Sequence, residues 1–248
     1  MEWRDEGVLL TVRRHGESAA IIDVFTAEHG RHSGVVRGGA SRKMAPSLQP
    51  GAQLSLEWRA RLEDHLGAFR VEPVRSRAAA LMSDGDALAA MGSISALLTA
   101  YLGDREPHRD FYAATVSLLD SIGVDPDWRE AYVGWELILL AELGFPLDLS
   151  RCAATGSTED LAWVSPRSGR AVSAAAGAPY ADRLLPLPAF LGGAGPDASV
   201  RGGVELLGYF LKSWVAPSFG ADEPPEARKR FADRMASRNA APNSLQSE

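Results

Sequence analysis

The segment from Arg31 to Lys43 carries the residue types best suited to bind phosphate. It holds four positive charges, no negative charge and three glycines, in a chain whose formal net charge is −6. A flexible loop presents such charges together, and arginine binds phosphate through paired hydrogen bonds. The segment therefore predicts contact with an anionic surface, most commonly a phosphate backbone. The alternative is a solvated loop with ordinary surface arginines.

Charge is divided unevenly along the chain. Residues 1–77 hold 12 Lys and Arg against 10 Asp and Glu, a net charge of +2, which leaves −8 for the remainder. A mildly basic head and an acidic body indicate different partners for the two parts. The single cysteine excludes an internal disulfide, and no run approaches the ~20 apolar residues of a membrane helix. We expect a cytoplasmic, nucleoid-associated protein with no membrane contact.

Motifs of the common enzyme classes do not occur. The sequence contains no G-x-x-x-x-G-K-[ST], no G-x-S-x-G and no H-E-x-x-H, and its five histidines show no ligand spacing. We therefore expect neither catalysis nor a cofactor. A metal-dependent hydrolase is the weakest interpretation, because it lacks a ligand cluster.

Cys152 stands in a spacing typical of a zinc ribbon. Thr155, Ser173 and Ala176 would complete the pattern C-x2-C-x17-C-x2-C if all three were cysteine. A single thiolate with no nearby histidine cannot hold zinc tetrahedrally. We expect a degenerate, metal-free zinc-ribbon-like insertion in an irregular region near residues 150–200.

Five short β-strands are predicted in the head. They lie at residues 8–12, 19–25, 30–37, 54–59 and 69–72. Apolar runs and period-2 alternation define them, and short turns rich in Gly and Pro separate them. The five-stranded OB-fold is the commonest small barrel that binds oligonucleotides. We predict an OB-fold domain over residues 1–77.

After Pro73 the pattern changes to that of helices. Helices are predicted at residues 87–102, 110–122, 126–143 and 204–215. An acidic N-terminal cap precedes the first helix, and Gly123 and Gly144 end the next two. We predict a helical domain over residues 78–235 and a disordered tail over 236–248, with fraying from Asp233 onward.

Basic residues of the head are the candidate DNA contacts. They are Arg13, Arg14, Arg31, Arg37, Arg42, Lys43, Arg59, Arg61 and Arg70. Arg59 and Arg70 fall on strand faces opposite the predicted core, where they would extend the loop as one stripe. Among the aromatic residues of the head, only Trp3 is expected to be free to stack on a base. Phosphate contacts should therefore dominate, with steep salt dependence and little sequence preference.

Several short motifs follow one another in a specific order and spacing. They are Asp5-Glu6-Gly7-Val8-Leu9-Leu10, Asp23-Val24-Phe25-Thr26-Ala27-Glu28-His29-Gly30, Val36 to Lys43, Leu48-Gln49-Pro50-Gly51, and Trp135 to Phe145 followed by Cys152. In this order they resemble the RecO family of bacterial DNA repair and recombination mediators, over nearly the whole chain. No single motif is decisive.

The resemblance implies a specific function. It implies an N-terminal OB-fold, a helical C-terminal domain, binding of single- and double-stranded DNA, and annealing of complementary strands. It also implies partnership with RecR and with the acidic C-terminal tail of single-stranded DNA-binding protein, to help load RecA. The family's DNA-binding role maps onto Arg37, Arg42 and Lys43. Many members carry a four-cysteine zinc site, which does not carry over here.

Arg129 is the candidate contact for that acidic tail. It lies on the predicted helix that carries Tyr132 and Trp135, and such a peptide needs a basic, apolar groove. A surface arginine without a partner role is the alternative. For the whole chain, the alternative function is a protein–protein adaptor with an OB-fold that does not bind nucleic acid directly, which the acidic total charge favours.

Overall fold

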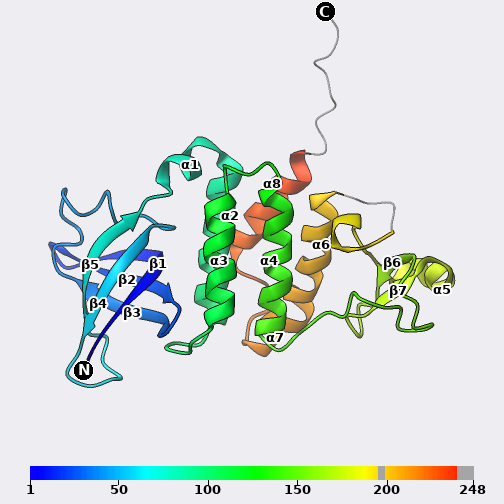
Figure 1. The fold of residues 1–248 in the computed structure, drawn as a ribbon, viewed down its shortest axis with the longest axis horizontal. Helices are drawn as coiled ribbons and strands as arrows, with labels where there is room; N and C mark the ends of the chain where they lie inside the picture. Colours follow the sequence, from blue (N-terminus) through cyan, green and yellow to red (C-terminus); the bar gives the residue numbers. More distant parts are fainter. Residues whose placement is uncertain (195–198, 239–248) are drawn as a thin grey trace, which may run out of the picture. The chain divides into compact units, whose positions relative to one another are not determined.

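Two compact units make up the chain, residues 1–126 and residues 127–248 (Figure 1). The computed structural model describes residues 1–194 and 199–238. Within these residues, no helix combines the length and the apolar character that crossing a membrane requires.

The first unit begins with a closed five-stranded barrel. Its strands are β1 (Glu2–His15), β2 (Ala19–Thr26), β3 (Gly30–Val36), β4 (Gln53–Arg59) and β5 (Ala68–Arg75). They are ordered β1-β2-β3-β5-β4 and close by the antiparallel pairing of β1 with β4. The pairing of β3 with β5 is parallel. Apolar side chains that alternate along the strands, among them those of Leu9, Val24, Leu54 and Trp58, fill the interior. The predicted OB-fold barrel is confirmed.

Three helices complete the first unit. They are α1 (Ala78–Ser83), α2 (Gly85–Tyr101) and α3 (Arg109–Ser121). The carboxylate of Asp84 caps α2 by accepting from the backbone N–H of Asp86, as the acidic cap predicts. The hydroxyl of Ser95 on α2 donates to the Leu10 carbonyl at 3.0 Å, and the ring of Phe111 on α3 packs against that of Phe25. Because these helices pack on the barrel, a domain boundary at residue 77 remains a prediction.

The second unit is built mainly from helices. They are α4 (Trp128–Glu142), α5 (Ala174–Gly177), α6 (Val200–Phe210), α7 (Ala216–Ser218) and α8 (Glu226–Arg238), with a π-helical turn at Leu211–Val215 and 3-10 turns at Ala178–Arg183 and Ala189–Leu191. Tyr132 and Phe231 pack ring against ring between α4 and α8. The helical body that was predicted is confirmed.

Two expectations about the second unit are wrong. The region near 150–200 is not simply irregular, because β6 (Leu161–Val164), β7 (Ala171–Ser173) and β8 (Leu185–Pro186) form a small sheet. Strands this short carry too few residues to show a period. Asp233 to Arg238 are helical rather than frayed, because Phe231 and Met235 anchor α8 in the core. The predicted disorder of residues 239–248 lies outside the described residues.

Candidate nucleic-acid interface

The loop after β3 is folded into consecutive turns rather than extended. The hydroxyl of Ser41 accepts from the Met44 backbone N–H, and the Ala45 N–H donates to the Ser41 carbonyl at 2.9 Å. Leu48 is buried in the barrel core and Met44 packs against that core. Arg42 and Lys43, which lie between these anchors, are exposed. The loop therefore presents its cations outward from a fixed base.

A second loop brings two more arginines beside the first. Arg13 and Arg14 directly precede His15, the last residue of β1, next to the turn to β2, and the Ala40 N–H donates to the Ser18 carbonyl at 3.0 Å. Gly39 lies so close to Ala20 that an added Cβ would meet its methyl group at 2.9 Å. We call the two loops and their cations the cationic loops. Those cations are Arg13, Arg14, Arg37, Arg42 and Lys43.

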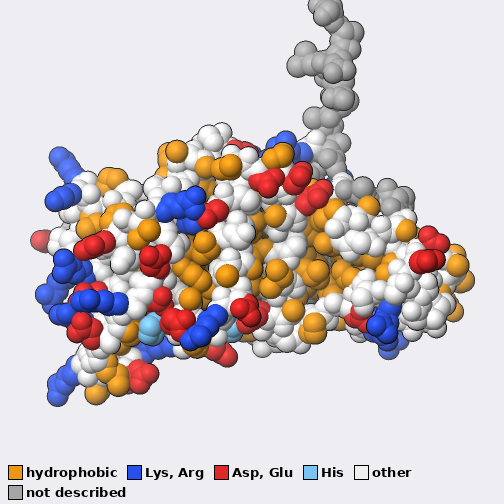
Figure 2. Space-filling view, viewed as in Figure 1, with side chains coloured by type: hydrophobic (Ala, Val, Ile, Leu, Met, Phe, Trp, Pro, Cys, Tyr) orange, Lys and Arg blue, Asp and Glu red, His pale blue; other side chains and the backbone are white. Residues whose placement is uncertain are grey.

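The cationic loops leave their charges unneutralised. In the part of the chain that the structure describes, none of these five side chains lies within 4 Å of a carboxylate. All five residues are exposed, and Glu17 is the one acidic residue of the same two loops. Figure 2 shows blue side chains gathered over the barrel. Five exposed cations on two adjoining loops can contact successive phosphates.

A hollow of about 840 Å³ adjoins the first loop. Arg37, Arg59 and Arg70 line it together, so the structure brings three of the predicted contacts to one place. Its apolar lining includes Phe69 and Met44. The hollow also contains two carboxylates, which sequence reasoning did not associate with these arginines.

Arginines and glutamates alternate on the surface that β1, β4 and β5 share. We call this surface the outer face; it consists of Glu2, Arg4, Glu6, Ser55, Glu57, Arg59, Arg70 and Glu72. Strand register sets Arg4 opposite Glu57, and Glu57 opposite Arg70. Arg59 lies 3.0 Å from Glu2 and 2.5 Å from Glu57, and the hydrogen bond to Glu2 together with both charges raises the pKa of Arg59. Three arginines thus face four glutamates, so the outer face is not a basic stripe.

Two predicted contacts lie apart from both surfaces. The Arg31 guanidinium is largely buried, where it pairs with Asp104 at 2.5 Å and donates to the Leu102 carbonyl at 3.2 Å. The structure therefore does not bring Arg31 to the cationic loops. Arg61 is exposed and follows Ala60, which lines the hollow. Both remain predictions as DNA contacts.

Trp3 is not free to stack on a base. Its ring stacks on that of His29 at 4.0 Å between centroids and lies nearly parallel to that of Trp58 at 5.7 Å. The expectation fails because β1 starts alongside the end of β4. Burial among these rings lowers the pKa of His32 to about 4, so His32 is neutral near pH 7.

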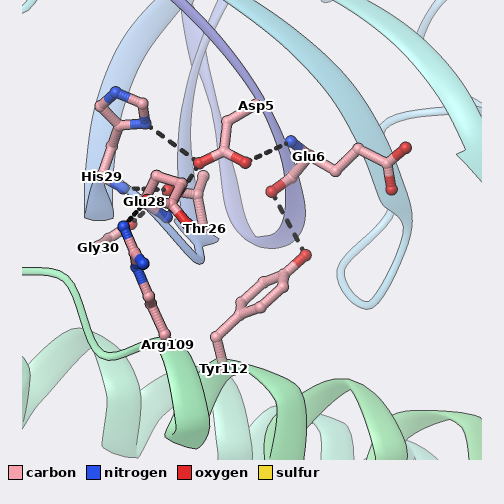
Figure 3. Close-up of polar contacts among 8 residues, drawn as sticks. All are labelled: Asp5, Glu6, Thr26, Glu28, His29, Gly30, Arg109 and Tyr112. Carbon is pink, nitrogen blue, oxygen red and sulfur yellow. Dashed lines mark hydrogen bonds and ion pairs between the residues drawn. The ribbon is translucent and has the colours of Figure 1, made fainter.

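Asp5 organises the contacts beneath this aromatic cluster (Figure 3). It accepts from the backbone N–H of Glu6 at 2.8 Å and of Glu28 at 3.1 Å, and its carboxylate lies 3.1 Å from His29 Nδ1. The helix α3 joins the network, because Arg109 pairs with Glu28 and the Tyr112 hydroxyl donates to the Glu6 carbonyl. These polar groups hold α3 against the barrel. The Glu6 carboxylate points away from them (Figure 3).

Two family models cover most of the chain. The model described as Recombination protein O N terminal matches residues 1–77, and the one described as Recombination protein O C terminal matches residues 82–221. The chain belongs to the RecO family. The barrel with its cationic loops thus corresponds to the N-terminal RecO region.

RecO proteins of several bacteria are similar to this chain over nearly its whole length. The DNA repair protein RecO of Roseobacter denitrificans is 57% identical over 240 residues, which cover 96% of this chain and 100% of the relative. The DNA repair protein RecO of Cereibacter sphaeroides strain KD131 is 57% identical over 238 residues, covering 95% and 99%. That of Jannaschia sp. is 54% identical over 236 residues, covering 95% and 96%.

Cys152 lies within the RecO C-terminal match and is buried. Its sulfur accepts from the Ser173 N–H at 3.2 Å and from the Ser173 hydroxyl at 3.4 Å. Burial raises the pKa of the Cys152 thiol, but hydrogen bonds from Ser173 and Thr155 lower it by a larger amount, so the pKa is about 6. Among the described residues, no group of three or more His, Cys, Asp or Glu is placed to hold a metal. The zinc-ribbon-like interpretation of this region remains a prediction.

Arg129 lies in the same RecO C-terminal match, near the start of α4. Its guanidinium stands 4.3 Å from the centroid of the Trp128 ring, a cation–π contact. Tyr132 and Trp135, the aromatic residues expected to accompany it in a groove, are buried in the core. A peptide cannot reach these two rings, and the role of Arg129 remains a prediction.

Proposed function

We propose that this RecO-family chain is a non-enzymatic DNA-binding recombination mediator in DNA repair. The observation that carries the proposal is the set of five exposed cations on the cationic loops, none paired with a carboxylate of residues 1–194 or 199–238. Unpaired surface cations attract phosphate and release its counterions on binding, which supplies most non-specific affinity. These five cations stand together in a chain whose formal net charge is −6.

The chemistry of the loops favours phosphate over bases. Trp3 already stacks on His29 and lies nearly parallel to Trp58, so the ring expected to be free for a base has partners within the barrel. Contacts to phosphate position a protein on DNA without reading sequence. We infer binding of both single- and double-stranded DNA with little sequence preference, and annealing of complementary strands held by their backbones.

The partner proteins are inferred from the RecO family and not from the geometry of the barrel. Several relatives are named DNA repair protein RecO. We propose that the chain acts with RecR and with the C-terminal tail of single-stranded DNA-binding protein, and helps to load RecA on coated single strands. Arg129 is the proposed contact for the tail. Titration of a fluorescent tail peptide tests it: Arg129→Ala should weaken binding, and unchanged affinity would discard the assignment.

Salt-dependent binding of labelled oligo-dT tests DNA binding itself. The variant Arg37→Gln, Arg42→Gln, Lys43→Gln should lose affinity at low salt, and the slope of log K against log salt should become shallower by about 2, at about 0.7 per lost contact. A matched control is Arg151→Gln, Arg167→Gln, Arg183→Gln, which removes three exposed arginines from the second unit. It should bind nearly as wild type does.

Three outcomes contradict the proposal. Binding that is equal at about 50 and about 200 mM salt would remove phosphate contact as its basis. A wild-type chain that binds no DNA would favour the alternative, a protein–protein adaptor. Equal losses in both triple variants would show that net charge, rather than the cationic loops, governs affinity.

A further inference from the structure

Glu57 occupies the centre of the outer face. It stands between Arg4 on β1 and Arg70 on β5 in the strand register. It lines both the hollow of about 840 Å³ and a neighbouring hollow of about 270 Å³. Only 16% of its side chain is exposed. A largely buried carboxylate therefore stands in the wall of the surface that carries three arginines of the barrel.

The Glu57 carboxylate engages two of these arginines at once. Its Oε2 lies 3.2 Å from the nearest nitrogen of Arg4, and its Oε1 lies 2.5 Å from that of Arg59. Both arginine side chains are otherwise accessible, with 74% and 62% of their surface exposed. A phosphate that approaches Arg4 or Arg59 must displace an existing anionic partner and meets the repulsion of the carboxylate. These guanidiniums consequently gain little from binding DNA.

We propose that Glu57 limits the affinity of this protein for DNA by holding Arg4 and Arg59 in ion pairs. This inference rests on the proposed DNA-binding function and assigns a determinant of its strength. DNA phosphates are then held by the cationic loops and kept off the outer face. A protein that brings strands together must also release them, and a neutralised outer face keeps the contact small.

Glu57→Gln is the direct test, with labelled oligo-dT as the ligand. The amide keeps the shape of the side chain, frees Arg4 and leaves Glu2 as the remaining anionic partner of Arg59. We expect affinity at low salt to rise about two- to fivefold, which matches the strength of a surface ion pair. We also expect the salt slope to steepen by about 0.7 for each arginine that gains a phosphate. A role confined to structure would leave that slope unchanged.

Glu6→Gln is the matched control on the same face. It makes the same change in net charge, but Glu6 forms no ion pair with an arginine within the described chain, so no guanidinium is freed. It should leave the salt slope at its wild-type value. The double variant Glu57→Gln, Arg4→Gln restores the net charge and removes the arginine that Glu57→Gln frees, so it should lose much of the gain.

Each result decides the proposal. A steeper slope in Glu57→Gln alone supports it, as does reversal in the double variant. Equal behaviour of Glu57→Gln and Glu6→Gln overturns it, and so does a Glu57→Gln protein that is folded by thermal melting and binds like wild type. If Glu57→Gln does not fold, Glu57→Ala removes the same carboxylate: tighter binding with a steeper slope retains the proposal, and a folded Glu57→Ala protein that binds like wild type overturns it. A wild-type chain that fails to bind DNA at all removes the proposed function, which is a separate and recognisable result.

Discussion

The cationic loops carry five basic residues and the outer face of the same barrel carries three, and the two surfaces differ in how these residues are paired. Among the residues that the structure describes, the five cations of the loops have no carboxylate partner, whereas Arg4, Arg59 and Arg70 stand among four glutamates of the outer face. An unpaired arginine is available to a phosphate, and a paired one must first lose its partner. The comparison teaches that pairing, rather than the number of arginines, locates an anion-binding surface.

The largest effect on stability is expected where an ion pair is buried. In the second unit, Arg228 Nε lies 2.8 Å from Glu136, with both side chains almost fully buried, and Arg228 also donates to the Val204 carbonyl at 2.7 Å. Arg228→Met should lower the free energy of unfolding by about 3–5 kcal/mol, because it leaves a buried carboxylate unpaired. Denaturant unfolding measures this. Arg230→Met, an exposed position on the same helix, should change stability by less than about 0.5 kcal/mol. Similar losses in both would contradict the assignment.

A smaller effect on stability is expected where burial keeps a histidine uncharged. The pKa of His32 is about 4 in the folded chain, and about 6.5 is usual for an exposed histidine. Between these values the unfolded chain binds more protons than the folded one, so this contribution is fully present above about pH 6.5 and is lost as pH falls toward 4. Thermal melting should therefore show a smaller fall in Tm between about pH 7 and about pH 5 for His32→Gln than for wild type. Parallel curves would show that His32 titrates normally.

The smallest effect is expected at the exposed pairs. Arg59 is exposed, and such ion pairs contribute about 0–1 kcal/mol. Arg59→Gln should therefore lower the unfolding free energy by less than about 1 kcal/mol in urea. A loss of several kcal/mol would mean that the ion pairs of the outer face stabilise the barrel. Their glutamates would then have a structural role, without any effect on DNA binding.

The sequence predicted the barrel more completely than it predicted the site. Period-2 alternation placed Trp58 inside and Arg59 outside, and local glycines and charges identified the loop that contains Arg42. The pairing of Arg4 with Glu57 depends on the register between strands that lie far apart in the chain, which no local pattern reports. The same limit explains Trp3, whose neighbours come from β2–β3 and β4.

The same physical limit applies to the second unit. The helix α8 was not predicted because its polar residues outnumber its apolar ones. Packing of Phe231 and Met235 makes it part of the core. By contrast, α2 was predicted because its cap and its apolar residues are local features. Elements that depend on distant partners are the ones that the sequence alone does not reveal.

The most direct test of the account compares two triple variants of the barrel. One removes the loop cations, as Arg37→Gln, Arg42→Gln, Lys43→Gln; the other removes the arginines of the outer face, as Arg4→Gln, Arg59→Gln, Arg70→Gln. The measurement is the slope of log K against log salt for oligo-dT, since carboxylates left unpaired change affinity without removing a phosphate contact. We predict a slope shallower by about 2 for the loop variant and by less than about 0.7 for the outer-face variant. Equal changes, or a larger change for the outer face, would contradict the claim that unpaired loop cations hold the DNA.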